Sequence, residues 1–292
     1  AESGQGRKRG AENSGHFTKL STDGSGGQCS GQRALPGKSV LHRSGWSVGM
    51  SNFRKFLNHF SDLLFPGICP ICEKAPYKDG LSYMCVECED LLPWIQKNGC
   101  KYCGIPMSGF DFNGLVCAGC REEPPQFQAG KCLFLLDQNG KKVIHEIKYH
   151  GVKDMLKDLP RWLDRNPSFR EFLKDSVLVP VPLHPKRFKK RGFNQSQWIA
   201  DAMEKEMGGS VRVIEALIRV RNTPTQTEFA RVERKKNVKN AFALKTKNCL
   251  EAQNRIVLID DVYTTGATLD ECAKALLDEG FQNVNVATLG HG

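Results

Sequence analysis

The C-terminal part of the chain contains two adjacent carboxylates at a position where a strand is expected to end. Residues 257–259 are apolar, and Asp260 and Asp261 follow them directly in the stretch RIVLIDDVYTTGATLDECAKALLDEGF. In α/β proteins, ligands bind at the carboxyl ends of the strands. The two acids are therefore candidates for binding a ligand, and the simpler alternative is that they only cap a turn.

A threonine-rich loop leads from the acids to a predicted helix. The helix is expected to begin near Thr268, because apolar residues then recur along one face as far as Gly280. The free N–H groups and the dipole at a helix N-terminus attract phosphate, and glycine lets the backbone close around an anion. A capping box formed by Thr268 and Glu271 is the simpler interpretation of that threonine. The predicted phosphate cradle comprises Thr264, Thr265, Gly266, Ala267 and Thr268.

Paired acids that directly precede a phosphate cradle suit a sugar phosphate as the ligand. The acids would bind vicinal ribose hydroxyls, and the cradle would bind the 5′-phosphate. The sequence contains neither G-x-x-x-x-G-K-[ST] nor G-x-G-x-x-G. This excludes a Walker-type nucleotide site and a dinucleotide-binding fingerprint.

A second candidate site consists of cysteines between residues 69 and 120. Eight of the twelve cysteines form four Cys-x-x-Cys pairs, with spacers of 12, 11 and 13 residues between successive pairs. Two such pairs supply the four thiolates of a tetrahedral zinc site. The pairs are Cys69/Cys72, Cys85/Cys88, Cys100/Cys103 and Cys117/Cys120.

The cysteine spacing favours structural zinc over disulfides. No apolar leader core is visible in the first residues, so the chain is expected in the cytoplasm, where thiols stay reduced. Four cysteines per ion leave no open position, which predicts two structural Zn²⁺ ions. Whether consecutive or interleaved pairs share an ion stays open. The remaining cysteines are expected to be apolar or surface residues: Cys29, Cys132, Cys249 and Cys272.

Beyond residue 130, predicted strands and helices alternate. This pattern predicts an α/β fold with a mainly parallel sheet that is covered on both faces. The expected strands are 131–136, 175–182, 255–259 and 283–289. The expected helices are one that ends at Gly151, then 154–164, 194–207 and 268–280. The basic segment LHPKRFKKRGFNQ, residues 183–195, is expected to be a loop.

Composition places the chain among globular proteins and suggests anionic partners. It has 292 residues, 40% of them hydrophobic, and a formal net charge of +10. No run of eighteen apolar residues occurs, so no membrane-spanning helix is expected. A basic surplus favours phosphorylated metabolites, nucleic acid or acidic lipid headgroups as partners.

Changes in composition and in the spacing of apolar residues divide the chain into four segments. Residues 1–49 are rich in Gly and Ser and lack apolar periodicity, so we expect them to be disordered. Residues 50–66 carry apolar side chains at helical spacing and predict an amphipathic helix. Residues 67–125 form the predicted double zinc-ribbon module, and residues 130–292 form the α/β domain.

The stretch VLIDDVYTTGAT resembles the phosphoribosyl pyrophosphate (PRPP) motif of type I phosphoribosyltransferases. Together with the zinc module, the segments IKYHG and VPVPLHPKRFKKRGFNQS resemble the ComF family, which is related to bacterial competence proteins. The resemblance covers about residues 63–289. It implies a type I phosphoribosyltransferase fold for residues 130–292, Mg²⁺-dependent PRPP binding and, for some members, a part in DNA uptake. Further residues that match the family pattern are Gln226, Arg231, Arg234 and Asn237.

The resemblance also implies roles for single residues. Asp260 and Asp261 would hold the ribose hydroxyls directly or through Mg²⁺, and residues 264–268 would hold the 5′-phosphate. The basic run at residues 186–191 matches the place where the fold binds pyrophosphate, with Arg187 and Arg191 as preferred candidates and Lys148 as a further one. A solvated or nucleic-acid-facing surface is the alternative for this run. Residues 219–242 correspond to a flap that closes over PRPP.

Three functions are compatible with these residues. The first is an enzyme that transfers phosphoribosyl from PRPP to an unidentified nitrogen acceptor with release of pyrophosphate, without an assigned catalytic base. The second is a non-catalytic PRPP-fold protein that acts in DNA uptake by binding single-stranded DNA or competence proteins. The third senses PRPP without consuming it. From residue 50 onward the chain has 35 basic and 29 acidic residues, which gives the second function little support. The sequence leaves the oligomeric state open, including a homo-oligomer.

Overall fold

In a computed structural model of the chain, the described residues are 68–74, 83–96, 99–107, 116–221, 239–245 and 250–292. The chain divides into two units, Ala1–Val40 and Leu41–Gly292, and all described residues belong to the second unit. The expected disordered segment 1–49, the expected helix 50–66 and residues 222–238 of the expected flap lie outside the described residues.

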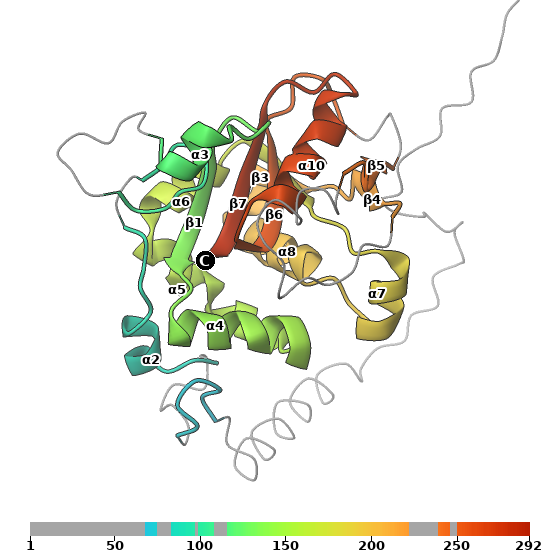
Figure 1. The fold of residues 1–292 in the computed structure, drawn as a ribbon. Coiled ribbons are helices and arrows are strands. Elements are labelled where there is room, and N and C mark those ends of the chain that lie inside the picture. Colours follow the sequence, from blue (N-terminus) through green and yellow to red (C-terminus); the bar gives the residue numbers. More distant parts are fainter. Residues whose placement is uncertain (1–67, 75–82, 97–98, 108–115, 222–238, 246–249) are drawn as a thin grey trace, which may run out of the picture. The chain divides into compact units, whose positions relative to one another are not determined.

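A five-stranded parallel sheet forms the centre of the described structure (Figure 1). Neighbouring strands are parallel at every pairing in the order β1-β7-β6-β2-β3. The strands are β1 (Gly130–Leu135), β2 (Ser176–Pro180), β3 (Val211–Val213), β6 (Ile256–Tyr263) and β7 (Val284–His291). A separate antiparallel pair consists of β4 (Leu217–Arg219) and β5 (Phe242–Leu244). The expectation of an α/β fold with a mainly parallel sheet is confirmed.

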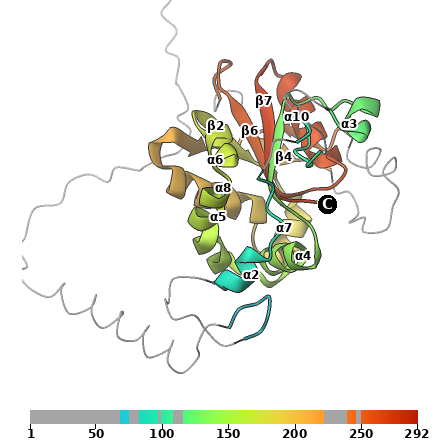
Figure 2. The ribbon, with the colours of Figure 1, turned by 90° about the vertical axis from the view of Figure 1, so that its left-hand side faces the viewer.

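Helices cover both faces of this sheet, which explains why its strands are continuous apolar runs. On β6, Val257 and Ile259 belong to the core shared with α5 and α8, whereas Ile256 and Leu258 belong to the core shared with α10. Figure 2 shows α5, α6 and α8 on one side of the strands and α10 on the other. The helices on the first side are α4 (Gln138–His145), α5 (Leu159–Arg165), α6 (Pro167–Leu173) and α8 (Gln195–Met207), and α10 is Ala267–Leu277.

Short helical turns connect these elements. The helix expected to end at Gly151 finishes as a π-helical turn, η1 (Glu146–His150), and Gly151 follows with a φ of 65°. The helix expected at 154–164 begins as a 3₁₀ turn, η2 (Lys153–Asp158), because Pro160 in the first turn of α5 cannot donate a backbone hydrogen bond. The remaining turns are α2 (Val86–Asp90), α3 (Ala118–Glu122) and η3 (Gly208–Ser210).

Strand β6 continues past the point where the sequence suggested a turn. Its expected end at Ile259 is wrong, because β7 also continues and pairs Asp260 with Thr288 and Tyr263 with His291. The two acids therefore lie within the C-terminal half of a paired strand and not in a loop. Pairing with the neighbouring strand β7 fixes the positions of their backbone atoms.

The basic segment is also different from the expectation. Residues 185–191 form the helix α7 (Pro185–Arg191) and not a loop. His184 caps this helix by accepting from the Lys186 N–H at 3.2 Å, Pro185 opens its first turn, and Gly192 ends it with a φ of 84°. Charged residues do not prevent a helix when both of its ends carry such signals.

The cysteine-rich segment contacts the α/β elements at several points, including a short strand pairing and a network of charged side chains. Its residues 93–95 run beside β1: the Ile95 N–H donates to the Leu133 carbonyl at 2.8 Å, and the Leu135 N–H donates to the Pro93 carbonyl at 3.0 Å. This pairing covers the edge of the sheet that β1 would otherwise expose.

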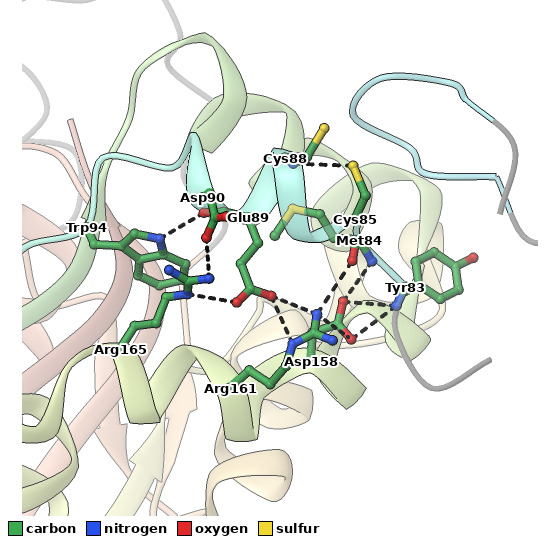
Figure 3. A network of polar contacts seen from close by, with 10 residues as sticks. All are labelled: Tyr83, Met84, Cys85, Cys88, Glu89, Asp90, Trp94, Asp158, Arg161 and Arg165. Carbon is green, nitrogen blue, oxygen red and sulfur yellow. Dashed lines mark hydrogen bonds and ion pairs between the residues drawn. The ribbon is translucent and has the colours of Figure 1, made fainter. Parts of the chain in front are cut away.

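A second attachment is the network of charged side chains (Figure 3). The buried carboxylate of Asp158 accepts from the N–H groups of Tyr83 and Met84, at distances of 2.7–3.0 Å. The buried Glu89 of α2 pairs with Arg161 and Arg165 of α5, at distances of 2.7 and 2.8 Å. These contacts hold the first cysteine cluster against η2 and α5.

Asp158→Asn should lower the free energy of unfolding by about 1–3 kcal/mol, because the amide removes the buried charge that lies 3.4 Å from Arg161 and places an NH2 donor beside the Tyr83 N–H. The measurement is urea unfolding followed by tryptophan fluorescence. The matched control is Asp154→Asn on the same turn, whose exposed carboxylate pairs only with Lys157 among the described residues and should change stability by less than about 0.5 kcal/mol. Equal effects of the two substitutions would contradict this assignment.

Candidate functional site

The eight paired cysteines form two separate clusters. The Sγ atoms of each cluster lie within 4.8 Å of one another. The Cys72–Cys85 and Cys103–Cys117 sulfur distances are 3.8 and 3.7 Å, close to the roughly 3.8 Å between two thiolates on one tetrahedral Zn²⁺. Consecutive pairs therefore share an ion, which settles the pairing that the sequence left open. The clusters are Cys69, Cys72, Cys85 and Cys88, and Cys100, Cys103, Cys117 and Cys120.

Local backbone geometry prepares these thiolates for a metal. The Cys88 N–H donates to the Cys85 sulfur at 3.2 Å, and the Cys117 N–H donates to the Cys100 sulfur at 3.4 Å. All eight are free cysteines and not disulfides. With four thiolates and no open position in each cluster, both are structural zinc sites. Cys132 and Cys272 are buried in the core, whereas Cys29 and Cys249 lie outside the described residues.

The two acids lie at the carboxyl end of β6 and have different partners. Asp261 is buried, and its Oδ2 lies 3.0 Å from Nζ of Lys148, which comes from the π-helical turn η1. Asp260 is half-buried, and its Oδ1 accepts from the Ser196 hydroxyl at 2.8 Å and from the Asp261 N–H at 2.9 Å. The structure therefore brings predicted residues from η1 and β6 together at one edge of the sheet.

Burial and like charge shape the titration of this pair. Burial, followed by the charge of Asp261, raises the pKa of Asp260 to about 7, although Lys148 and the Ser196 hydroxyl act in the opposite direction. Burial lowers the pKa of Lys148, but the attraction of Asp261 and Asp260 outweighs it, so this pKa is raised overall. The ammonium therefore stays charged and compensates the buried carboxylate.

The threonine-rich loop ends at the N-terminus of α10. Gly266 precedes the helix with a φ of 73°, and a Cβ at this position would lie 2.3 Å from the Tyr263 hydroxyl oxygen. The position is therefore restricted to glycine. Thr264 is exposed, Thr265 and Thr268 are half-buried, and Ala267 begins the helix. The loop therefore places threonine hydroxyls and a helix N-terminus directly after the strand that carries the two acids.

The capping-box interpretation of Thr268 is wrong. The helix begins at Ala267, so Thr268 lies inside its first turn, and the carboxylate of Glu271 accepts from the Asn240 N–H at 2.9 Å instead.

The predicted basic residues lie on two elements that contact one another. Arg187 and Arg191 are half-buried on α7. Arg191 donates to the Gln195 side chain at 2.6 Å, and its guanidinium lies 5.4 Å from the ring centre of Tyr149 in η1. Burial, followed by the charge of Arg191, lowers the pKa of Arg187. Lys148, the further residue predicted to contact pyrophosphate, pairs with Asp261 at 3.0 Å.

Comparisons with known proteins bear on both sites. A family model described as a double zinc ribbon domain matches residues 60–121. The DNA utilization protein YhgH of Escherichia coli K12 is 32% identical over 232 residues, which cover 77% of this chain and 96% of the relative. Competence protein ComFC of Bacillus subtilis is 28% identical over 68% of this chain and 79% of the relative. Competence protein F of Haemophilus influenzae is 26% identical over 70% of this chain and 95% of the relative. The chain belongs to the ComF family.

Two residues near the acid pair of this ComF-family protein could not be predicted from the sequence. Ser196 binds Asp260, but it is one of several polar residues at the start of α8. Arg219 is buried on β4, 5.2 Å from the ring centre of Phe242. Burial lowers the pKa of Arg219, as does Arg187, whereas Asp260 raises it. Arg219 therefore lies within the electrostatic reach of both predicted groups.

A cleft of about 510 Å³ opens next to the same edge. It is lined by aromatic, proline and polar side chains that include Asn194, Phe193, Trp198 and Arg219. The rings of Phe193 and Trp198 stack with their centres 4.0 Å apart. Among the described residues, no helix combines the length and apolar character needed to cross a bilayer.

The zinc content should be two ions per chain in protein purified without added metal or chelator. Cys85→Ser should reduce it to one, because the first cluster loses a thiolate. Elemental analysis after gel filtration measures this. Cys132→Ser is the control, since Cys132 belongs to neither cluster and should leave two ions. Two ions in the Cys85 variant would show that the first cluster is not a four-thiolate site.

Asp260→Asn should stabilise the ligand-free protein more at pH 8 than at pH 5. The folded-state pKa of about 7 exceeds the ordinary value of about 3.9. The folded state therefore gives up stability as the pH rises from about 4 to about 7. The difference between the two pH values should be on the order of 1–3 kcal/mol. Thermal unfolding measures it.

The control for this pH effect is Asp278→Asn. It changes an exposed carboxylate at the C-terminal end of α10, the helix that follows the predicted phosphate cradle. It should show no such pH dependence. A gain that is equal at both pH values for Asp260→Asn would contradict the raised pKa.

Proposed function

We propose that the chain binds PRPP with Mg²⁺ at the carboxyl end of β6 and transfers its phosphoribosyl group to a nitrogen acceptor. One observation carries this proposal: an acid pair, half-buried Asp260 and buried Asp261, is followed within one short loop by the glycine-led N-terminus of α10. In the ligand-bound state the carboxylates accept from the two ribose hydroxyls. The N–H groups and hydroxyls of residues 264–268 donate to the 5′-phosphate.

The acid pair also fits a hard divalent cation. Mg²⁺ prefers carboxylate and phosphate oxygens together with water. Among the described residues, the partner of the buried Asp261 Oδ2 is the Lys148 ammonium at 3.0 Å, which leaves this oxygen a further lone pair for a cation. Asp260 and Asp261 would hold the ion, and the ion would neutralise the charge of the leaving diphosphate.

The protein's own cations support the departure of pyrophosphate. Arg187 and Arg191 of α7 lie near η1, which carries Lys148, and their positive charge stabilises the diphosphate. A bond forms between the acceptor nitrogen and the anomeric carbon while the bond to the pyrophosphate oxygen breaks and its electron pair leaves with pyrophosphate. The nitrogen then releases its proton. The protein positions the reactants and stabilises charge rather than forming a covalent bond.

A second candidate function is binding of single-stranded DNA in DNA uptake. It is favoured by the names of the relatives, which concern DNA utilization and competence. The cleft adds a physical observation, because stacked aromatic rings next to basic side chains are a binding platform for bases. Lys153 lies 5.7 Å from the ring centre of Trp198 in that cleft. An affinity that falls steeply with salt is the signature of this function.

The double substitution Asp260→Asn with Asp261→Asn should weaken PRPP binding in the presence of Mg²⁺ by at least about 100-fold, because two charge-assisted hydrogen bonds of about 1.5–3 kcal/mol each are lost. Calorimetric titration measures the affinity, and zinc content near two per chain confirms that the variant is folded.

Asp278→Asn is the control for this loss and should bind as the unaltered protein does, since Asp278 pairs with Lys274 at the surface. Unchanged PRPP affinity in the double variant would mean that the acids do not bind the sugar phosphate.

A further inference from the structure

A third group of metal-ligating side chains lies outside the zinc ribbons and away from the acid pair. His145 ends α4, and Glu146 and His150 begin and end the π-helical turn η1. One ring nitrogen of each histidine and one carboxylate oxygen of Glu146 lie within 4.8 Å of one another. We propose that these three residues bind a divalent transition-metal ion, with Zn²⁺ as the ion that suits them.

The π-helical turn is what brings the two histidines together. In an α-helix of 3.6 residues per turn, positions five apart point about 140° away from each other. In a π-helical turn the backbone hydrogen bonds join residues five apart, so these positions stack one above the other. The ring centres of His145 and His150 accordingly lie 4.9 Å apart. An ordinary helix with the same sequence would not form this group.

The distances suit a small ion after minor side-chain rotation. Nδ1 of His150 lies 2.9 Å from a carboxylate oxygen of Glu146, and Nδ1 of His145 lies 4.0 Å from the other oxygen. Ligand atoms on one tetrahedral Zn²⁺ lie about 3.3–3.5 Å apart, given bond lengths of about 2.0–2.2 Å. The observed separations bracket this value, so small side-chain rotations bring Glu146 and each histidine to the spacing of two ligands on one ion.

The solvent exposure of the two histidines and the charges around them also suit a bound cation. The side chains of His145 and His150 are 54% and 57% exposed, so water can occupy the remaining coordination positions. The Glu146 carboxylate supplies negative charge and is largely buried. Two lysines of the same helical segment have other partners: the Lys148 ammonium pairs with Asp261, and the Lys142 ammonium donates to the Ile71 carbonyl at 2.9 Å. Two imidazoles and one carboxylate suit Zn²⁺ and its neighbours in the transition series.

An ion bound at this site would stabilise the π-helical turn η1. The ion would join residues at both ends of η1, and the same turn carries Lys148 to Asp261. Metal binding therefore favours the backbone conformation that places this ammonium at the end of β6. The proposed metal site does not depend on PRPP being the ligand there, and its test needs no activity measurement.

The experiment is equilibrium dialysis of the full chain, already loaded with its two ribbon ions, against buffered micromolar free Zn²⁺ at pH 7.5, followed by elemental analysis. The unaltered protein should take up one further ion per chain. His150→Ala and His145→Ala should each weaken this uptake by at least about tenfold, because each removes a direct ligand. His184→Ala is the control, since His184 caps α7 and lies outside the cluster, and it should keep the additional ion.

Two readouts show that the variants are folded: retention of the two ribbon ions and an unchanged thermal midpoint. His150→Gln serves as a second substitution if His150→Ala fails these controls. Two results would overturn the proposal. One is the absence of a further ion in the unaltered protein. The other is a further ion that persists undiminished in both the His145 and His150 variants, in which case the Glu146–His150 contact is an ordinary surface pair.

Discussion

The ion pair between Lys148 and Asp261 is the contact on which the carboxyl end of the sheet depends. Strand β6 carries two adjacent acids, the half-buried Asp260 and the buried Asp261, alongside β7. A buried carboxylate without compensation costs about 3–5 kcal/mol, and Lys148 supplies the compensation from η1 at 3.0 Å. The π-helical turn, the following Gly151 with its positive φ, and the contact of Tyr149 with Arg191 all serve to place this one ammonium. The acids can then remain at the sheet edge for use by a ligand.

The zinc ribbons and the sheet stabilise each other. The first cluster is followed by α2, whose Glu89 pairs with Arg161 and Arg165 of α5, and residues 93–95 cover the edge strand β1. Small ribbons have little core of their own, so the ion supplies much of their folding energy. The charged network and the strand pairing join the first ribbon to α5 and to β1, so folding of the ribbon also stabilises these two elements. The second cluster also lies close to the cradle, because Cys120 lines one small pocket together with Tyr263, Thr265 and Gly266.

The sequence predicted the parallel sheet, the four cysteine pairs and the acid pair, because each depends on local spacing. Contacts between distant segments could not be predicted. The length of β6 depends on β7 pairing as far as His291, and Ser196 reaches Asp260 only through the packing of α8. The helix α7 was missed for a different reason: its basic residues suggested an exposed loop, although Pro185 and Gly192 mark both helix ends. The capping box failed because the helix starts at Ala267, directly after Gly266.

A crystal structure of the chain with PRPP and Mg²⁺ would test the central claim most directly. The account predicts that the 5′-phosphate lies against residues 264–268, with the two ribose hydroxyls within hydrogen-bonding distance of Asp260 and Asp261 and the diphosphate facing Lys148 and α7. PRPP bound elsewhere, for example with its phosphates on α7 and its ribose away from β6, would contradict the account.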